Sequence, residues 1–222
     1  MKLVILLGPP GVGKGTQCAL LSSRLGFKHI STGSIIRKEI QSQSELGLRV
    51  KSLVEAGNLV DDKTIFLCLE KALNDLNCSS GSTILLDGLP RNLSQARDLD
   101  LLIQRTSFEC VQVVCLDADT ELLTQRFQSR FTCSNCGNVE SIDVQDHDIV
   151  SLEAYKCKSC KSVGSMARRR DDEASTVRHR LDLYQKETLP LVSFYKDKNI
   201  ISFVNGLMPP ESVYVRVASF LI

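Results

Sequence analysis

The sequence predicts an α/β fold in which helices cover both faces of a five-stranded parallel sheet. Five short runs of largely apolar residues alternate with longer stretches of amphipathic periodicity. The runs are nearly continuous in apolar residues, which is typical of strands buried on both faces. A glycine-rich stretch stands between the first run and the first amphipathic stretch, in the order strand, turn, helix.

The expected elements follow from these patterns in chain order. The apolar runs predict strands at residues 3–7, 28–31, 83–87, 111–117 and 200–204. Apolar residues that recur every three or four positions predict the helices. These helices are expected at residues 14–25, 33–42, 45–56, 61–76, 94–105, 119–130, 171–187 and 210–221.

Two segments interrupt the alternation of strands and helices. Residues 31–60 hold two successive helices where one crossover would suffice, and residues 130–167 have no helical pattern but contain four cysteines. Both are expected to be insertions above the carboxyl ends of the strands, where ligands bind in such sheets. The predicted organisation is a core domain of residues 1–30, 61–129 and 168–222, a first insertion of residues 31–60 and a second insertion of residues 130–167.

Composition narrows the class of protein. A chain of 222 residues with 43% apolar content can bury a substantial core, and its formal net charge of +1 argues against a broadly basic nucleic-acid binder. No apolar run is long enough to cross a bilayer, and Met1 and Lys2 lead directly into the first strand, so we expect a cytoplasmic protein. Nine cysteines favour metal ligation and free thiols over a disulfide framework.

The stretch from Gly8 to Thr16 predicts a phosphate-binding loop. A strand, a glycine-rich turn and a helix N-terminus direct backbone N–H groups toward one anion, which the helix dipole also favours. Lys14 can reach the outer phosphates, and Thr16 supplies the hydroxyl because Gly15 intervenes after the lysine. The alternative is a glycine-rich turn with a surface lysine. The candidate loop residues are Gly11, Val12, Gly13, Lys14, Gly15 and Thr16.

The first insertion begins and ends with residues suited to a second nucleotide. Thr32 and Arg37 stand about one helical turn apart, so a hydroxyl and a guanidinium can hold one phosphate. Gly57 at the other end lets a base approach the backbone that follows it. Alternatively, Thr32 caps a helix and Arg37 is a solvated surface residue. The candidate base-contacting residues are Asn58, Leu59 and Val60.

More polar residues follow the third expected strand. Asp87 ends this strand and is placed to hold Mg²⁺, directly or through water. Arg91 follows a turn and can reach a second phosphate, while Gln95 can read adenine with one donor and one acceptor. The alternatives are a turn-forming aspartate and a helix-surface glutamine. The turn before Arg91 consists of Gly88, Leu89 and Pro90.

The second insertion contains two C-x-x-C pairs separated by twenty residues. This spacing is a strong indication of a closed, structural zinc site with thiolate in all four positions. The rival is a zinc ribbon that binds nucleic acid through nearby lysines and through residues 168–170. The expected ligands are Cys133, Cys136, Cys157 and Cys160. The other cysteines are expected to be ordinary small apolar residues: Cys18, Cys68, Cys78, Cys110 and Cys115.

These motifs, together with Arg169-Arg170-Asp171-Asp172 and Arg180, resemble in order and spacing the adenylate kinases of the long bacterial type with a zinc-binding lid. The resemblance covers essentially the whole chain. It implies a P-loop NTPase core, Mg²⁺-dependent transfer from ATP to AMP giving two ADP, an NMP-binding first insertion and a zinc-binding lid as the second insertion. It also implies no nucleic-acid or membrane partner, and we expect a monomer.

Such chemistry needs cations rather than a general base, because the acceptor is already a phosphate anion. By resemblance, Arg126 and Arg130 attend the donor, whereas Arg169 and Arg180 bridge to the transferring phosphate. Their spacing predicts that the first two share a helix face, as do the second two if the stretch between them is helical. The alternative for each is a salt-bridged surface arginine. The candidate catalytic residues are Lys14, Arg91, Arg126, Arg130, Arg169 and Arg180.

Some positions depart from the family pattern. Leu89 stands where phenylalanine is common, and Val139-Glu140 replaces a small residue followed by an aromatic. The second change is expected to remove a stacking surface and to add a negative charge near the donor base. Met208 occupies the position of a donor-base backbone contact. The open alternatives are a kinase for another monophosphate, a GTP-using donor site, or a nucleotide-switched zinc-ribbon protein that binds nucleic acid.

Overall fold

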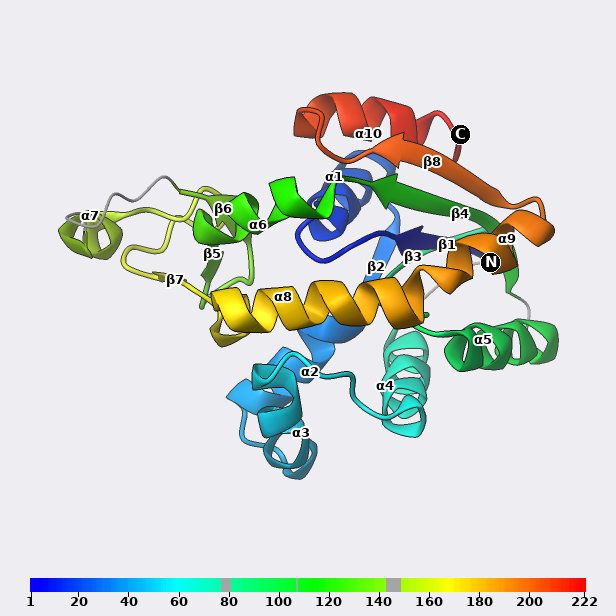
Figure 1. Cartoon of the computed structure of the whole chain (residues 1–222), viewed down its shortest axis with the longest axis horizontal. Coiled ribbons are helices and arrows are strands. Elements are labelled where there is room, and N and C mark those ends of the chain that lie inside the picture. The colour runs from blue at the N-terminus through cyan, green and yellow to red at the C-terminus, as the bar shows by residue number, and fades with distance from the viewer. Residues whose placement is uncertain (77–80, 107, 143–148) are drawn as a thin grey trace.

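A computed structural model of the chain describes residues 1–76, 81–106, 108–142 and 149–222. The main sheet has five parallel strands in the order β2-β3-β1-β4-β8, with β1 at its centre (Figure 1). The predicted fold class is confirmed. The strands are β1 (Lys2–Leu7), β2 (Lys28–Ser31), β3 (Thr83–Asp87), β4 (Glu109–Asp117) and β8 (Ile201–Asn205).

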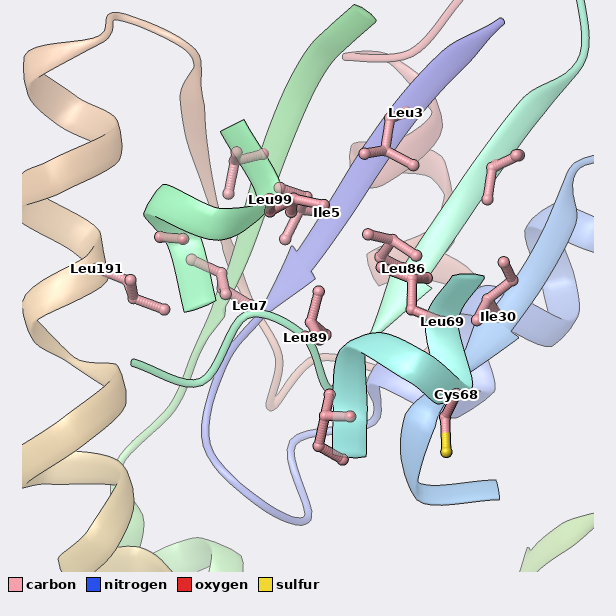
Figure 2. Close-up of a cluster of buried hydrophobic side chains, with 14 of the residues drawn as sticks. Leu3, Ile5, Leu7, Ile30, Cys68, Leu69, Leu86, Leu89, Leu99 and Leu191 are labelled. Atoms are coloured by element: carbon pink, nitrogen blue, oxygen red, sulfur yellow. The ribbon is translucent and has the colours of Figure 1, made fainter. Parts of the chain in front are cut away.

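Alternate residues of the central strands enter two separate hydrophobic clusters, one on each face. Leu3, Ile5 and Leu7 of β1 pack in the cluster drawn in Figure 2, whereas Val4 and Leu6 belong to the opposite one. The first cluster is covered by α4 (Asp62–Asp75), α5 (Leu93–Arg105) and α9 (Pro190–Asp197). The second is covered by α1 (Lys14–Leu25), α6 (Thr120–Gln128) and α10 (Pro210–Ala218). Burial on both faces explains why the strands read as continuous apolar runs.

The first insertion folds into two helices, α2 (Thr32–Gln41) and α3 (Glu45–Glu55), as expected. The second insertion carries a small antiparallel sheet in the order β6-β5-β7 that the sequence did not predict. Its strands are β5 (Arg130–Cys133), β6 (Val139–Ser141) and β7 (Met166–Ala167), and it also contains a short helix, α7 (Ile149–Ala154). The prediction of no helix in this segment is therefore wrong. In Figure 1 this insertion projects from the main sheet on one side of α8 (Ala174–Leu183).

The helices around α8 differ from the predicted single helix at 171–187. A 3₁₀ turn at Arg170–Asp172 precedes α8, and a π-helical turn at Tyr184–Thr188 leads into α9, which was not predicted. Likewise α6 ends at Gln128, and Arg130 begins β5 instead of continuing the helix. Hydrophobic periodicity missed these boundaries because tertiary packing, and not local pattern, decides where such helices break. Within the described ranges, no helix combines the length and apolar character needed to cross a bilayer.

Candidate active site

The phosphate loop lies between the end of β1 and the start of α1. Gly13, the residue before α1, has φ 105°, a conformation that favours glycine, and a Cβ at Gly11 would lie 2.6 Å from the Phe127 ring. The Lys14 ammonium donates to the carbonyl oxygens of Gly8 at 2.7 Å and Pro9 at 3.0 Å. Burial lowers the pKa of Lys14 to about 8, because the nearby negative charge does not fully offset the cost of burying the ammonium.

Asp87 ends β3 directly beside this loop. A Cβ added at Gly15 would lie 3.7 Å from its Oδ2, and Nε2 of His29 lies 3.7 Å from the same oxygen. Burial favours the neutral carboxyl, but His29 and the charge of Lys14 outweigh it and hold the pKa of Asp87 below its usual value. Asp87 is therefore charged at neutral pH and suits a hard cation such as Mg²⁺.

Cys18 places its sulfur within 4.8 Å of the His29 and Asp87 ligand atoms. Burial raises the pKa of this thiol well above its ordinary value. The thiol therefore stays protonated and acts as an apolar residue, as expected for it and for the buried Cys68 and Cys115. Cys78 lies outside the described residues, and so does the side chain of Cys110.

Five arginines from separate parts of the chain lie close enough to affect one another's charge. Burial lowers the pKa of Arg91 to about 10, and the charges of Arg180 and Arg37 contribute. Burial also lowers the pKa of Arg169 to about 10, with contributions from Arg37 and Arg130. Because guanidinium groups carry a positive charge at neutral pH, these side chains repel one another and favour the entry of an anion. Its members are Arg37, Arg91, Arg130, Arg169 and Arg180.

Two aspartates partly neutralise this arginine group. Arg180 Nη1 lies 3.0 Å from Asp171 Oδ2 and 3.3 Å from Asp172 Oδ1, while Arg130 forms an ion pair with Asp172. The prediction that Arg126 and Arg130 share a helix face is wrong because Arg130 lies in β5. For Arg169 and Arg180 the prediction required a helical stretch between them, and that condition is not met because α8 begins only at Ala174. Tertiary structure, and not helical spacing, brings these side chains together.

An open cavity lies between the first insertion, the end of β3 and α8. Nine of the twelve residues expected to bind the acceptor line it. These are Thr32, Arg37, Asn58, Leu59, Val60, Gly88, Arg91, Gln95 and Arg180. The other three are Leu89, which is buried in the core, Pro90 and Arg169. Six further residues line it that were not among the candidate binding residues: Gly33, Ile36, Val54, Gly57, Ile65 and Asp171. Of these, Gly57 was expected to let a base approach, whereas the apolar residues Ile36, Val54 and Ile65 were missed.

The contacts in this cavity exclude two alternatives, a helix-capping Thr32 and a helix-surface Gln95. Ser31, and not Thr32, caps α2 by accepting from the N–H of Ser34, while the Thr32 hydroxyl donates to the Gly88 carbonyl at 3.0 Å. Gln95 is 1% exposed and is therefore not a helix-surface residue. Arg91 Nε also donates to the Gly88 carbonyl, at 2.8 Å, so one backbone oxygen aims two of the expected phosphate ligands.

Arg126 is held by backbone carbonyls of two loops. Its guanidinium donates to the carbonyls of Gly206 at 2.9 Å and Leu207 at 3.2 Å, beside the expected donor-base contact at Met208. Met208 packs against the second hydrophobic cluster. Arg126 therefore braces the loop after β8 against the phosphate loop, whose Val12 carbonyl is 3.5 Å away.

The Glu140 carboxylate makes its contacts within the second insertion. Its side chain is 5% exposed and accepts hydrogen bonds from the Tyr155 hydroxyl, the Asn138 amide and the N–H of Lys158. Although desolvation opposes it, these donors hold the pKa of Glu140 below its usual value. Glu140 thus holds the second insertion together, while its neighbour Val139 remains 37% exposed.

The four cysteines of the two C-x-x-C pairs lie in one cluster, with all sulfurs within 4.8 Å of one another. The Cys133–Cys160 and Cys136–Cys157 sulfur pairs are each 3.7 Å apart. Tetrahedral ligands at zinc–sulfur distances of about 2.3 Å would be separated by about 3.8 Å. Hydroxyls of Ser162 and Ser165 lower the pKa of Cys133 to about 5, whereas burial and the neighbouring thiols raise the pKa of Cys136 to about 11, so a bound cation is needed to hold all four as thiolates. The cluster fits a closed four-thiolate site.

Comparison with known proteins agrees with this geometry. The adenylate kinase family model matches residues 6–200. The adenylate kinase of Clostridium tetani (strain Massachusetts / E88) is 36% identical over 218 residues, which cover 98% of this chain and 97% of the relative. That of Elusimicrobium minutum (strain Pei191) is 34% identical over 220 residues, covering 99% and 98%. The chain therefore belongs to the adenylate kinase family.

Proposed function

We infer that the protein is an adenylate kinase, which transfers the terminal phosphoryl group of ATP to AMP and produces two ADP. The observation that carries this inference is the arginine group, which meets Lys14 beside one cavity in a member of that family. Because the acceptor is an anion, the reaction requires alignment and charge neutralisation instead of a general base. Buried cations with few counterions provide both.

ATP is assigned to the phosphate loop and the loop after β8. Backbone N–H groups at the start of α1 and the Lys14 ammonium would bind its phosphates, and the braced loop around Met208 would contact its base. Asp87 would hold Mg²⁺ through water, and this ion would neutralise charge on the phosphates. The proposed donor residues are Gly11, Val12, Gly13, Lys14, Gly15, Thr16, Arg126, Arg130, Val139, Glu140 and Met208.

AMP is assigned to the cavity. Arg37 and Arg91 would hold its phosphate, and the buried Gln95 would read its base. Arg169 and Arg180 would lie between the two phosphate groups and stabilise charge on the transferring group. One such cation can contribute roughly three to five orders of magnitude in rate.

We further propose that the first insertion is an NMP-binding domain and that the second is a lid with structural zinc, both acting on a core of residues 1–30, 61–129 and 168–222. Zinc would bind Cys133, Cys136, Cys157 and Cys160, which supply no open position for chemistry. The free thiols in the core accord with a reducing compartment such as the cytoplasm. A monomer suffices, since one chain contributes every residue of the site.

A nucleotide panel tests the assignment. ADP release is measured with each common nucleoside monophosphate as acceptor and with ATP or GTP as donor, in the presence and absence of Mg²⁺. We expect AMP and ATP to give the highest kcat/KM and expect no turnover without Mg²⁺. Preference for another monophosphate would identify a different kinase of the family, and GTP preference would contradict the donor assignment.

Arg91→Ala is expected to abolish most transfer to AMP while leaving ATP binding nearly unchanged, because the guanidinium lies on the acceptor side. A fall of about a thousandfold or more in kcat/KM for AMP is expected. Equilibrium binding of ATP and the rate of ADP formation are measured on the same preparation. Arg97→Ala, on the exposed face of α5, is the control. Unchanged transfer in Arg91→Ala would remove this residue from the site.

A further inference from the structure

The side-chain amide of Gln95 is held by two different partners at the floor of the acceptor cavity. The N–H of Arg91 donates to its Oε1 at 2.7 Å. Its Nε2 donates to Oδ1 of Asp62 at 2.7 Å. Gln95 is 1% exposed, so water does not replace either partner.

These two partners permit only one orientation of the amide. A backbone N–H can only donate, and a carboxylate can only accept. If the amide turned over, Nε2 would face the Arg91 N–H and Oε1 would face the Asp62 carboxylate. Two buried hydrogen bonds would become two repulsive contacts, which is costly in a site that excludes water.

Asp62 is itself positioned for this contact. It is the first residue of α4, but the preceding Asp61 caps that helix by accepting from the N–H of Thr64 at 2.9 Å. The Asp62 carboxylate is therefore available to α5, where Asn92 Nδ2 donates to the same Oδ1 at 3.2 Å. Asn92 also caps α5 by accepting from the N–H of Gln95 at 2.8 Å. The carboxylate thus links the starts of two helices to one amide.

We propose that Asp62 is a positioning residue that determines base specificity by fixing the Gln95 amide. The second Nε2 hydrogen and the second Oε1 lone pair remain for the base, in one fixed spatial order. Adenine offers an amine donor beside a ring-nitrogen acceptor, which this order can match. Hypoxanthine offers the reverse, a carbonyl acceptor beside a ring N–H donor. The proposal rests on the assignment of AMP to this cavity.

The test compares AMP with IMP, whose base is hypoxanthine, at saturating ATP. Asp62→Asn keeps the shape but adds a donor, and Asp62→Ala removes the acceptor. Both are expected to lower the AMP:IMP ratio of kcat/KM by about tenfold, through a higher KM for AMP, with KM for ATP unchanged. Asp61→Ala is the matched control: it removes the cap of α4 and lowers Tm but should leave the ratio unchanged.

The outcomes separate the proposal from the function on which it rests. If both Asp62 variants keep the wild-type ratio while Gln95→Ala lowers it, Gln95 reads the base without Asp62 and the proposal is overturned. If Gln95→Ala keeps the ratio as well, the base is read elsewhere and the proposal again fails. Efficient transfer to AMP by the wild-type protein in either case leaves the proposed function intact, whereas its absence would refute that function directly.

Discussion

At the scale of single residues, the site consists of cations whose charge is made costly by burial. Lys14 shows this most clearly, because burial lowers its pKa to about 8 although its ammonium donates to two loop carbonyls. A bound triphosphate would restore the missing counter-charge. The same reasoning applies to Arg91 and Arg169, although their pKa values of about 10 keep them charged throughout the physiological range.

The pKa of Lys14 predicts a pH dependence for the free enzyme. A lysine binds phosphates as a cation below its pKa and loses its charge above it, so kcat/KM for ATP is expected to fall above about pH 8. The profile is measured from neutral to alkaline pH, with Lys14→Met as the variant that should have low activity and lack this limb. A decline that begins only near the ordinary lysine value of 10.5 would contradict the expectation.

At the scale of elements, close helix packing shapes the first insertion. A Cβ at Gly47 of α3 would lie 2.0 Å from the Glu39 carbonyl oxygen of α2. The helices therefore approach so closely that a methyl group would force their backbones apart.

Gly47→Ala is accordingly expected to destabilise the protein by roughly 1–3 kcal/mol, despite the higher helix propensity of alanine. Thermal or urea unfolding measures the change. Ser52→Ala, at an exposed position of the same helix, is the control and should have little effect. Equal stability of the two variants would show that the helices separate without cost.

The second insertion has a small hydrophobic cluster of its own. Its buried members are Phe131, Cys133, Cys157 and Met166. Two of these four are cysteines of the proposed zinc site, so the metal would replace much of the missing core.

Removal of zinc by a strong chelator is expected to unfold this insertion and leave the main sheet folded. Limited proteolysis between residues 130 and 167 should accelerate by about tenfold or more, while circular dichroism changes little. Cys136→Ser should reproduce this effect and make the protein insensitive to the chelator. Unchanged protease resistance in the metal-free protein would refute a structural role for zinc.

At the scale of the whole molecule, the first insertion rests on the region around α8. Arg170 Nη1 lies 2.9 Å from Glu55 Oε1, and Asn58 Oδ1 lies 2.8 Å from His179 Nε2. Both contacts are exposed, and such pairs contribute at most about 1 kcal/mol. These contacts can stabilise an arrangement in which the first insertion lies against the region around α8, but they are too weak to prevent the insertion from moving away.

Independent closure of the two insertions over AMP and ATP is therefore expected, which would exclude water and assemble the arginine group. Small-angle scattering should show a smaller radius of gyration with a bisubstrate analogue than without it, and an intermediate value with AMP alone. Glu55→Gln should change the free state only slightly. Equal compactness in all states would contradict closure.

The sequence alone determined the parallel sheet, the phosphate loop and the four-cysteine cluster. These features depend on apolar runs, glycines and short-range spacing, all of which are local. It also indicated most of the residues that line the cavity beside α8, although the missed residues Ile36 and Ile65 look like ordinary helix-face residues until the helices are packed.

Only the tertiary structure decided how the arginines converge, where Glu140 places its charge and which partner orients Gln95. Arg130 and Arg169 reach the site from a strand and a turn, and the Asp62–Gln95 contact joins residues 33 positions apart. Spacing along a helix predicts only neighbours within a few turns. Contacts between separate elements depend on how those elements pack, and that information is not contained in any local pattern.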